Sequence, residues 1–168
     1  MGSLSLPFAF NGVVQGMKNQ EQRPVLSVDL VVTNSDGQIL LGHVTEKWSD
    51  RGRYNWGLPG REIMLGENLR AAAARSLHEE LGLRMTSVRF LSVNSNFGFG
   101  NHYVSISMLV EATGSMINKQ PADWTRWHWV EPSGLPERLF PSAARTLHAY
   151  LKGSTSLDLS EQEEPGYS

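Results

Sequence analysis

Residues 60–83 read GREIMLGENLRAAAARSLHEELGL and contain the clearest helix pattern in the chain. Apolar residues recur there at steps of three and four, and a run of four alanines favours a helix. A glycine at position 82 follows the last apolar residue and is typical of a helix end. The spacing predicts a helix over residues 67–81, in which the repeat consists of Leu69, Ala72, Ala73, Leu77 and Leu81.

The charged residues of this predicted helix fall on defined faces. Glu80 follows Ser76 by four residues and Glu79 follows Arg75 by four, so each pair stacks along one side of the helix. If the loop of residues 59–66 folds back over the helix, its carbonyl oxygens and the two glutamates meet in one volume. Oxygen ligands of this kind suit Mg²⁺ or Mn²⁺. Solvated helix faces also carry pairs of glutamates, so Glu79 and Glu80 alone are weak evidence for a metal site. The residues around them have to support it.

The composition limits the classes of protein to consider. A chain of 168 residues favours a single domain, and the absence of Cys excludes disulfide scaffolds, thiolate zinc sites and cysteine nucleophiles. A net charge of −2 gives no general attraction to nucleic acid or to anionic lipid, so a polyanionic ligand must be bound by a few placed cations or a metal. Because no long apolar run or signal-peptide pattern is present, we expect a cytoplasmic protein with no membrane or nucleic-acid partner.

Three regions follow from the pattern along the chain. Residues 1–22 form an N-terminal arm, residues 23–152 the domain, and residues 153–168 a flexible tail. Within the domain, the alternation of apolar and polar residues predicts strands at 25–33, 38–43, 88–93, 103–110 and 127–130, and a second helix at 141–152. The turn Asn34-Ser35-Asp36-Gly37 predicts that the first two strands form a hairpin. This order favours an α/β fold, with a mixed sheet that carries helices on its faces.

The spacing of the long motif resembles the signature of the Nudix hydrolases. The positions in register are Glu67, Arg75, Leu77, Glu79, Glu80, Gly82 and Leu83. Two positions depart from it: Arg61 stands where the signature begins with Gly, one residue after Gly60, and Ser76 replaces the first Glu of the helix. The resemblance covers roughly residues 25–150. It implies the Nudix fold, an α/β/α sandwich around a mixed β-sheet, and Mg²⁺-dependent cleavage of a nucleoside diphosphate linked to another group.

The resemblance also implies roles for individual residues. Glu79 and Glu80 correspond to catalytic metal ligands, and Glu67 and Arg75 to residues that support the metal site. A main-chain carbonyl of the Gly60–Arg61 turn is the expected further ligand, and the loss of a carboxylate at Ser76 implies fewer tightly held metals.

A second match lies later in the chain. Asp123 precedes Trp129 by six residues, where family members often place a further ligand or general base. The alternative for Asp123 is a turn aspartate in front of a strand.

The first half of the chain is most similar to the GDP-mannose mannosyl hydrolases, over residues 24–37, 40–42 and 80–84. This likeness implies that Asp29 and Tyr103 lie near the substrate. From the alternating pattern alone, Asp29 could equally lie on the solvent face of its strand. Val44, Glu62 and Trp124 replace polar or charged residues of that branch, and the second half looks more like nucleotide-pool-sanitising Nudix pyrophosphatases.

Aromatic and basic residues complete the candidate substrate site. Phe97 and Trp124 could offer flat faces on which a nucleotide base stacks, although such residues are often partly buried packing. His43 and Arg61 are the expected cationic contacts for phosphate.

The resulting prediction is an Mg²⁺- or Mn²⁺-dependent hydrolase of a small-molecule nucleotide substrate, with a nucleotide sugar such as GDP-mannose first. The alternatives are a nucleoside triphosphate pyrophosphohydrolase and a catalytically weak nucleotide-binding domain. Analogy with relatives adds a homodimer as an expectation.

Overall fold

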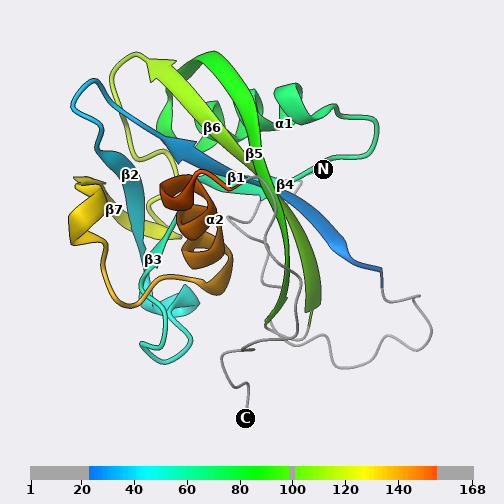
Figure 1. Ribbon diagram of the computed structural model, residues 1–168. Coiled ribbons are helices and arrows are strands. Elements are labelled where there is room, and N and C mark those ends of the chain that lie inside the picture. The colour runs from blue at the N-terminus through cyan, green and yellow to red at the C-terminus, as the bar shows by residue number, and fades with distance from the viewer. Residues whose placement is uncertain (1–22, 99–100, 155–168) are drawn as a thin grey trace.

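A computed structural model describes residues 23–98 and 101–154 (Figure 1). The predicted N-terminal arm and all but the first two residues of the predicted tail lie outside these ranges. The elements in chain order are β1 (Val25–Val32), β2 (Ile39–Val44), the 3₁₀ turn η1 (Glu46–Trp48), β3 (Trp56–Gly57), β4 (Gly60–Glu62), α1 (Leu69–Leu81), β5 (Arg84–Gly98), β6 (Asn101–Thr113), β7 (Trp124–Val130), the 3₁₀ turn η2 (Pro132–Gly134) and α2 (Pro141–Lys152).

The strands form two sheets. One has four strands in the order β4-β1-β6-β5, and the other has three in the order β3-β2-β7. The four-stranded sheet is mixed, because β1 pairs in parallel with β6 while its other pairs are antiparallel. Figure 1 shows α2 in front of this sheet and α1 behind it, which gives the predicted α/β/α layering.

The predicted hairpin of the first two strands is wrong. The turn itself forms, with Gly37 at φ 78° and the Asn34 N–H bonded to the Gln38 carbonyl at 3.1 Å. Only the bridge between Thr33 and Ile39 joins the two strands, which then diverge into different sheets. Both strands are buried on both faces, so each needs its own neighbours and its own covering layer.

The helices agree closely with the sequence pattern. α2 has the predicted bounds, with Pro141 in its first turn and Gly153 in the left-handed conformation at its end. α1 begins two residues later than predicted because the Asn68 side chain accepts the Ala71 N–H at 2.9 Å and caps the helix. Gly82, at φ 69°, ends it as expected.

Three strands are longer than predicted: β5, β6 and β7. In β5 the added residues include Asn94 and Asn96, which are polar but buried. Asn94 donates to the Thr146 hydroxyl of α2 at 3.2 Å, so a hydrogen bond compensates for its burial. The sequence did not predict the full length of β5, because its buried polar residues interrupt the apolar pattern. They pack against α2, which comes later in the chain.

The apolar core links both sheets to both helices. Leu30 of β1, Leu40 of β2, Leu77 of α1 and Leu147 of α2 are all buried within it. A second layer, which we call the polar layer, lies between the four-stranded sheet and α2 and consists of Ser27, Asp29, Asn94, Ser105, Ser107 and Thr146. Within the described residues, no helix is long and apolar enough to cross a membrane.

Candidate functional site

The connection between β3 and β4 lies over α1, as the sequence predicted. The Gly60 N–H donates to Glu80 Oε2 at 2.8 Å, and the Pro59 carbonyl accepts the Leu30 N–H at 2.8 Å. A Cβ atom on residue 60 would lie 2.0 Å from the Val28 carbonyl oxygen, so only glycine fits here. Glycine therefore brings the turn into contact with the helix glutamate.

Glu80 is fully buried and held by two donors. Its second oxygen, Oε1, accepts the indole N–H of Trp124 at 3.2 Å. Burial raises the pKa of Glu80 to about 8, although the Gly60 N–H, the Arg61 guanidinium and the Trp124 indole oppose this shift. The protonated form of Glu80 is therefore favoured at neutral pH, and a cation bound beside this carboxyl would favour its charged form.

Arg61, which was predicted as a cationic contact for phosphate, lies with its guanidinium beside Glu79. Its contact with phosphate stays a prediction. Its side chain is only 2% exposed, and its Nη1 atom is 2.9 Å from Glu79 Oε2. The contact is an ion pair without hydrogen-bond alignment, and the two terminal nitrogens of Arg61 have no hydrogen-bond acceptor within the described residues. A guanidinium thus occupies space next to Glu79 that the Gly of the Nudix signature would leave open.

Arg75 and Glu67 form a clamp at the start of the helix. Arg75 Nε and Nη2 each lie 2.8 Å from one oxygen of Glu67, and Nη2 also donates to the Glu62 carbonyl at 2.8 Å. The Met64 N–H also donates to Glu67 Oε2 at 3.0 Å. The hydrogen bonds from Arg75 hold the pKa of Glu67 below its usual value. Because the positively charged Arg75 guanidinium binds both oxygens of Glu67, the geometry favours the supporting role of Glu67 over that of a metal ligand.

The donors at this site fit a divalent cation of the magnesium type. Glu79 and Glu80 supply two carboxylates, and the Gly60–Arg61 turn contacts them through the Gly60 N–H and the Arg61 guanidinium. The main-chain carbonyl of this turn as a further ligand stays a prediction. Mg²⁺ typically takes one or two carboxylates and completes its shell with water and phosphate oxygens. Among residues 23–98 and 101–154, no group of three or more His, Asp or Glu side chains converges on one point. The smaller number of metals expected from Ser76 stays a prediction.

Asp123 has other partners than those expected. Its Oδ1 atom accepts the Trp48 indole N–H at 2.5 Å and lies 3.3 Å from Lys47 Nζ. Its neighbour Trp124, not Asp123 itself, reaches Glu80. Sequence reasoning missed Lys47 and Trp48, because nothing in the polar loop marked them as partners of a residue 75 positions later.

The structure changes the interpretation of two predicted substrate residues. Trp124 is 1% exposed, so the expectation that it offers a stacking face is wrong; its role is to pack in the core and to hold Glu80. Asp29 is fully buried in the polar layer, so the alternative of a solvent-facing position is wrong as well. Burial raises the pKa of Asp29 to about 7, opposed by the hydroxyls of Ser142, Thr146 and Ser105, none of which is aligned as a hydrogen bond.

The remaining predicted substrate residues have other partners than the helix glutamates among the described contacts. His43 packs edge-on against Trp56 with 4.8 Å between ring centroids, and burial together with the Arg126 charge lowers its pKa. Its neutral form is therefore favoured, which weakens its expected role as a cation for phosphate. Phe97 is 51% exposed and stacks on His102 with 4.6 Å between ring centroids. Tyr103 is buried, and its hydroxyl oxygen accepts a hydrogen bond from Asn101 Nδ2 at 3.2 Å.

Comparison with known proteins identifies the family. The NUDIX domain matches residues 23–150, which is most of the chain. The chain belongs to the Nudix family. This Nudix assignment agrees with the contact between the Gly60 turn and the helix glutamate.

Curated relatives share the name RNA pyrophosphohydrolase. The protein of that name from Novosphingobium aromaticivorans is 27% identical over 143 residues, which cover 73% of this chain and 86% of the relative. The one from Hamiltonella defensa is 40% identical over 68 residues, or 40% of this chain and 37% of the relative. None of the relatives compared here carries the name of a GDP-mannose hydrolase, so the predicted subfamily is not confirmed.

Solved structures confirm the fold. A MutT NUDIX hydrolase from Burkholderia pseudomallei superposes with a TM-score of 0.69 at 24% identity, over 76% of this chain and 98% of that chain. A UDP-X diphosphatase gives a TM-score of 0.62 at 16% identity, over 83% of this chain and 70% of that chain. At these identities the likeness establishes the architecture alone.

Proposed function

We propose that this Nudix hydrolase is a metal-dependent pyrophosphohydrolase that acts on the 5′-triphosphate of a nucleotide or of an RNA strand. The products would be a 5′-monophosphate end and pyrophosphate. The convergence of Gly60, Glu79 and Glu80 carries the proposal, because it provides carboxylates for a cation that a polyphosphate requires. The name shared by the relatives supports this reaction over cleavage of a nucleotide sugar.

The residues of the chain have distinct parts in this reaction. Glu79 and Glu80 would hold Mg²⁺ or Mn²⁺, which when bound neutralises charge on the polyphosphate and activates water for attack on phosphorus. The Gly60 N–H and the Trp124 indole fix the orientation of Glu80. The Arg75–Glu67 clamp fixes the loop over the helix. Arg75 also contacts Glu79, with 3.3 Å between Arg75 Nη1 and Glu79 Oε2.

Attack on a sugar carbon finds less support at this site. Such a reaction needs a cation near the leaving diphosphate and a base near the sugar. The positions that carry these groups in the GDP-mannose branch hold Val44, Glu62 and Trp124 here. Val44 and Trp124 are buried, so neither supplies the missing group. Asp123 stays a predicted general base, although its carboxylate is engaged with Lys47 and Trp48.

A panel of substrates tests the proposal. GTP, 5′-triphosphorylated RNA and GDP-mannose are each incubated with Mg²⁺ or Mn²⁺ in ¹⁸O-labelled water, and the products are separated. Pyrophosphate with a labelled phosphate product supports the proposal. Free labelled mannose with GDP would replace it by the nucleotide-sugar reaction, and no turnover of any substrate would leave a nucleotide-binding domain. The predicted homodimer and cytoplasmic location are independent of this result, and sedimentation equilibrium of the full chain tests the dimer.

A further inference from the structure

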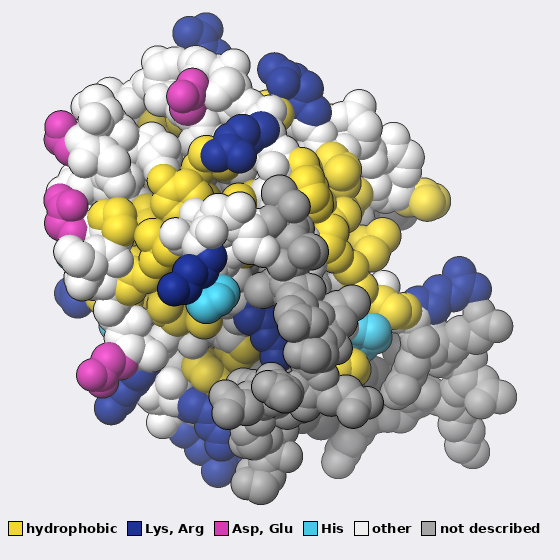
Figure 2. All heavy atoms as spheres, viewed as in Figure 1, with side chains coloured by type: hydrophobic (Ala, Val, Ile, Leu, Met, Phe, Trp, Pro, Cys, Tyr) yellow, Lys and Arg dark blue, Asp and Glu magenta, His cyan; other side chains and the backbone are white. Residues whose placement is uncertain are grey.

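A second group of charged residues surrounds a hollow away from the helix glutamates. The hollow has a volume of about 580 Å³ and is lined by Asp50, Arg51, Gly52, Arg53 and Arg138. We call it the arginine hollow. It carries three guanidinium groups against one carboxylate, in a chain whose net charge is −2. Figure 2 shows Lys and Arg side chains gathered at the lower edge of the molecule, over the segment that joins η1 to β3 in Figure 1.

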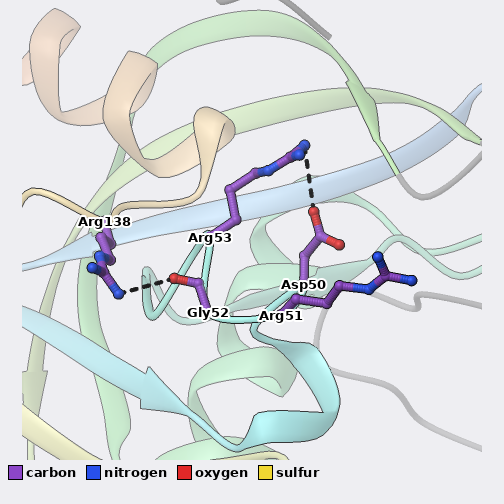
Figure 3. A pocket seen from close by; sticks show the side chains of 5 residues that line it. All are labelled: Asp50, Arg51, Gly52, Arg53 and Arg138. Atoms are coloured by element: carbon purple, nitrogen blue, oxygen red, sulfur yellow. Dashed lines mark hydrogen bonds and ion pairs between the residues drawn. The ribbon is translucent and has the colours of Figure 1, made fainter. Parts of the chain in front are cut away.

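The guanidinium groups of the hollow are largely available for a ligand. Arg51 has no ion pair or hydrogen bond with any described residue, and Arg53 is joined to Asp50 only by an exposed contact of 3.6 Å. Arg138 uses one nitrogen, which donates to the Gly52 carbonyl at 3.1 Å. In Figure 3, Asp50 stands between the ends of Arg51 and Arg53, and Arg138 reaches toward Gly52 from the other side of the loop. Guanidinium donors in this number are suited to phosphate oxygens.

The loop that presents these arginines is held in an unusual backbone conformation. Asp50 and Arg51 have φ values of 45° and 58°, and Gly52 follows at 83°. Two successive residues other than glycine in the left-handed region are uncommon, and such outliers concentrate at ligand sites. The conformation turns the Gly52 carbonyl toward Arg138 and places Arg51 and Arg53 on either side of Asp50.

The hollow and the metal site are connected through one strand. The N–H groups of Asn55 and Trp56 both donate to the Arg138 carbonyl, at 2.8 and 3.0 Å, so the hollow is attached to the start of β3. β3 then leads into the turn at Gly60, whose N–H binds Glu80. The seven steps along the chain from Arg53 to Gly60 set an upper limit of about 25 Å between the two positions. A strand of several nucleotides can bridge such a distance.

We propose that the arginine hollow binds the phosphodiester backbone of a single nucleic-acid strand whose 5′ end lies at the helix glutamates. This inference rests on the proposed function, because it assigns that activity a polynucleotide substrate. It also reverses the expectation of no nucleic-acid partner, which rested on net charge. Net charge describes the whole chain, whereas phosphate contacts depend on local groups such as the three arginines of the hollow.

Binding and turnover are measured separately to test it. Fluorescence anisotropy in EDTA gives the affinity for a labelled 5′-triphosphorylated RNA of ten nucleotides, and for a DNA of the same sequence, at several salt concentrations. The variant Arg51→Ala/Arg53→Ala is compared with the matched control Arg84→Ala/Arg89→Ala, which removes two exposed arginines of β5. Hydrolysis of GTP is followed for the same proteins.

We expect the hollow variant to bind RNA about tenfold more weakly, with a salt slope reduced by about 1.4 for two lost phosphate contacts. DNA binding should fall alike, because guanidinium groups contact phosphate rather than base or ribose. GTP hydrolysis should stay within about twofold of wild type, since a mononucleotide does not reach the hollow. The control variant should retain most of the RNA affinity.

Several results would overturn the inference. RNA affinity unchanged in the hollow variant, or an equal loss in the β5 control, would show that the hollow has no special part in binding. An equal loss of GTP turnover would assign the hollow to the polyphosphate of a mononucleotide instead. Arg51→Ala alone guards against misfolding, because this side chain has no described partner to lose. Failure of the proposed function is distinct, since it would abolish turnover of every substrate while binding in EDTA stays measurable.

Discussion

Arg61 Nη1 lies 2.9 Å from Glu79 Oε2, and Arg75 Nη1 lies 3.3 Å from the same oxygen. Two guanidinium groups therefore share one carboxylate oxygen of the expected metal pair. The Arg75 contact follows from its place one helical turn before Glu79, whereas the Arg61 contact comes from the residue that stands in place of the Gly of the Nudix signature. A divalent cation that binds Glu79 has to compete with the buried positive charge of Arg61.

Replacing Arg61 should therefore strengthen metal binding. We expect Arg61→Gly, which restores the Gly of the Nudix signature, to lower the dissociation constant for Mn²⁺ about tenfold, or by about 1.4 kcal/mol. Isothermal titration calorimetry and the loss of the free Mn²⁺ electron paramagnetic resonance signal measure this. Arg61→Lys keeps the charge and should bind Mn²⁺ as wild type does. An unchanged or weaker Mn²⁺ affinity in Arg61→Gly would show that Arg61 does not compete with the ion.

Glu80 should be indispensable for turnover but not for folding. Glu80→Gln keeps an oxygen that accepts the Gly60 N–H, while it removes the charge that a cation requires. We expect metal-dependent hydrolysis of the best substrate to fall about 100-fold or more. The free energy of unfolding should fall by only about 1 kcal/mol, because the Gln amide can accept just one of the two N–H groups that Glu80 binds. Steady-state kinetics and urea unfolding check both parts, with the exposed Glu111→Gln of β6 as control. Retained turnover in Glu80→Gln would remove Glu80 from the reaction.

The buried Asp29 predicts a pH-dependent penalty on stability. Its pKa is raised from 3.8 to about 7, so the folded state holds the proton more tightly than the unfolded chain does. The stability it contributes is complete below about pH 4 and is lost as the pH rises toward 7.

The variant Asp29→Asn should remove this penalty because its side chain stays neutral. We expect it to be more stable than wild type by about 3 kcal/mol at pH 8, with a difference that shrinks toward pH 4. Urea unfolding at several pH values measures the difference, and Asp36→Asn, in the exposed turn after β1, is the control. A difference that is constant with pH would contradict a buried, raised carboxyl at position 29.

Gly60 should tolerate no side chain. In Gly60→Ala the new methyl group would meet the Val28 carbonyl oxygen at 2.0 Å, so strand β4 has to shift away from β1. We expect a loss of about 3 kcal/mol in unfolding free energy, together with weaker Mn²⁺ binding because the N–H contact to Glu80 is disturbed. Gly134→Ala is the matched control, since a methyl group there meets nothing within 4 Å. Equal stability of the two variants would contradict the packing at Gly60.

The sequence predicted elements whose signals are local. α2 was predicted with its observed bounds because Pro141, an amphipathic pattern and Gly153 mark both ends within one stretch of chain. The contact of the Gly60 turn with Glu80 agrees with the resemblance to the Nudix signature, whereas the spacing alone allowed it only if the loop folds back over the helix. Burial of polar strand residues could not be predicted, because Asn94 finds Thr146 only after α2 has packed on the sheet.

The same limit applies to the candidate site. The carboxylates were predicted from spacing, but their partners were not, since Trp124 reaches Glu80 across 44 positions and Trp48 reaches Asp123 across 75. Trp124 was predicted as a stacking face because composition does not distinguish an exposed indole from a buried one. Its contact with Glu80 depends on the way the three-stranded sheet meets α1.

The parallel pairing of β1 with β6 has a consequence for how the protein is made. Among the described strands β1 is synthesised first, yet its parallel partner β6, which pairs Tyr103 with Val25, is synthesised only after α1. Such a non-local contact slows folding and leaves one edge of β1 exposed in the nascent chain. α1 can form from local interactions, but β1 can pair with β6 only after residues 101–113 have been synthesised. Chains truncated before β6 should therefore aggregate, although they already contain the complete Nudix signature.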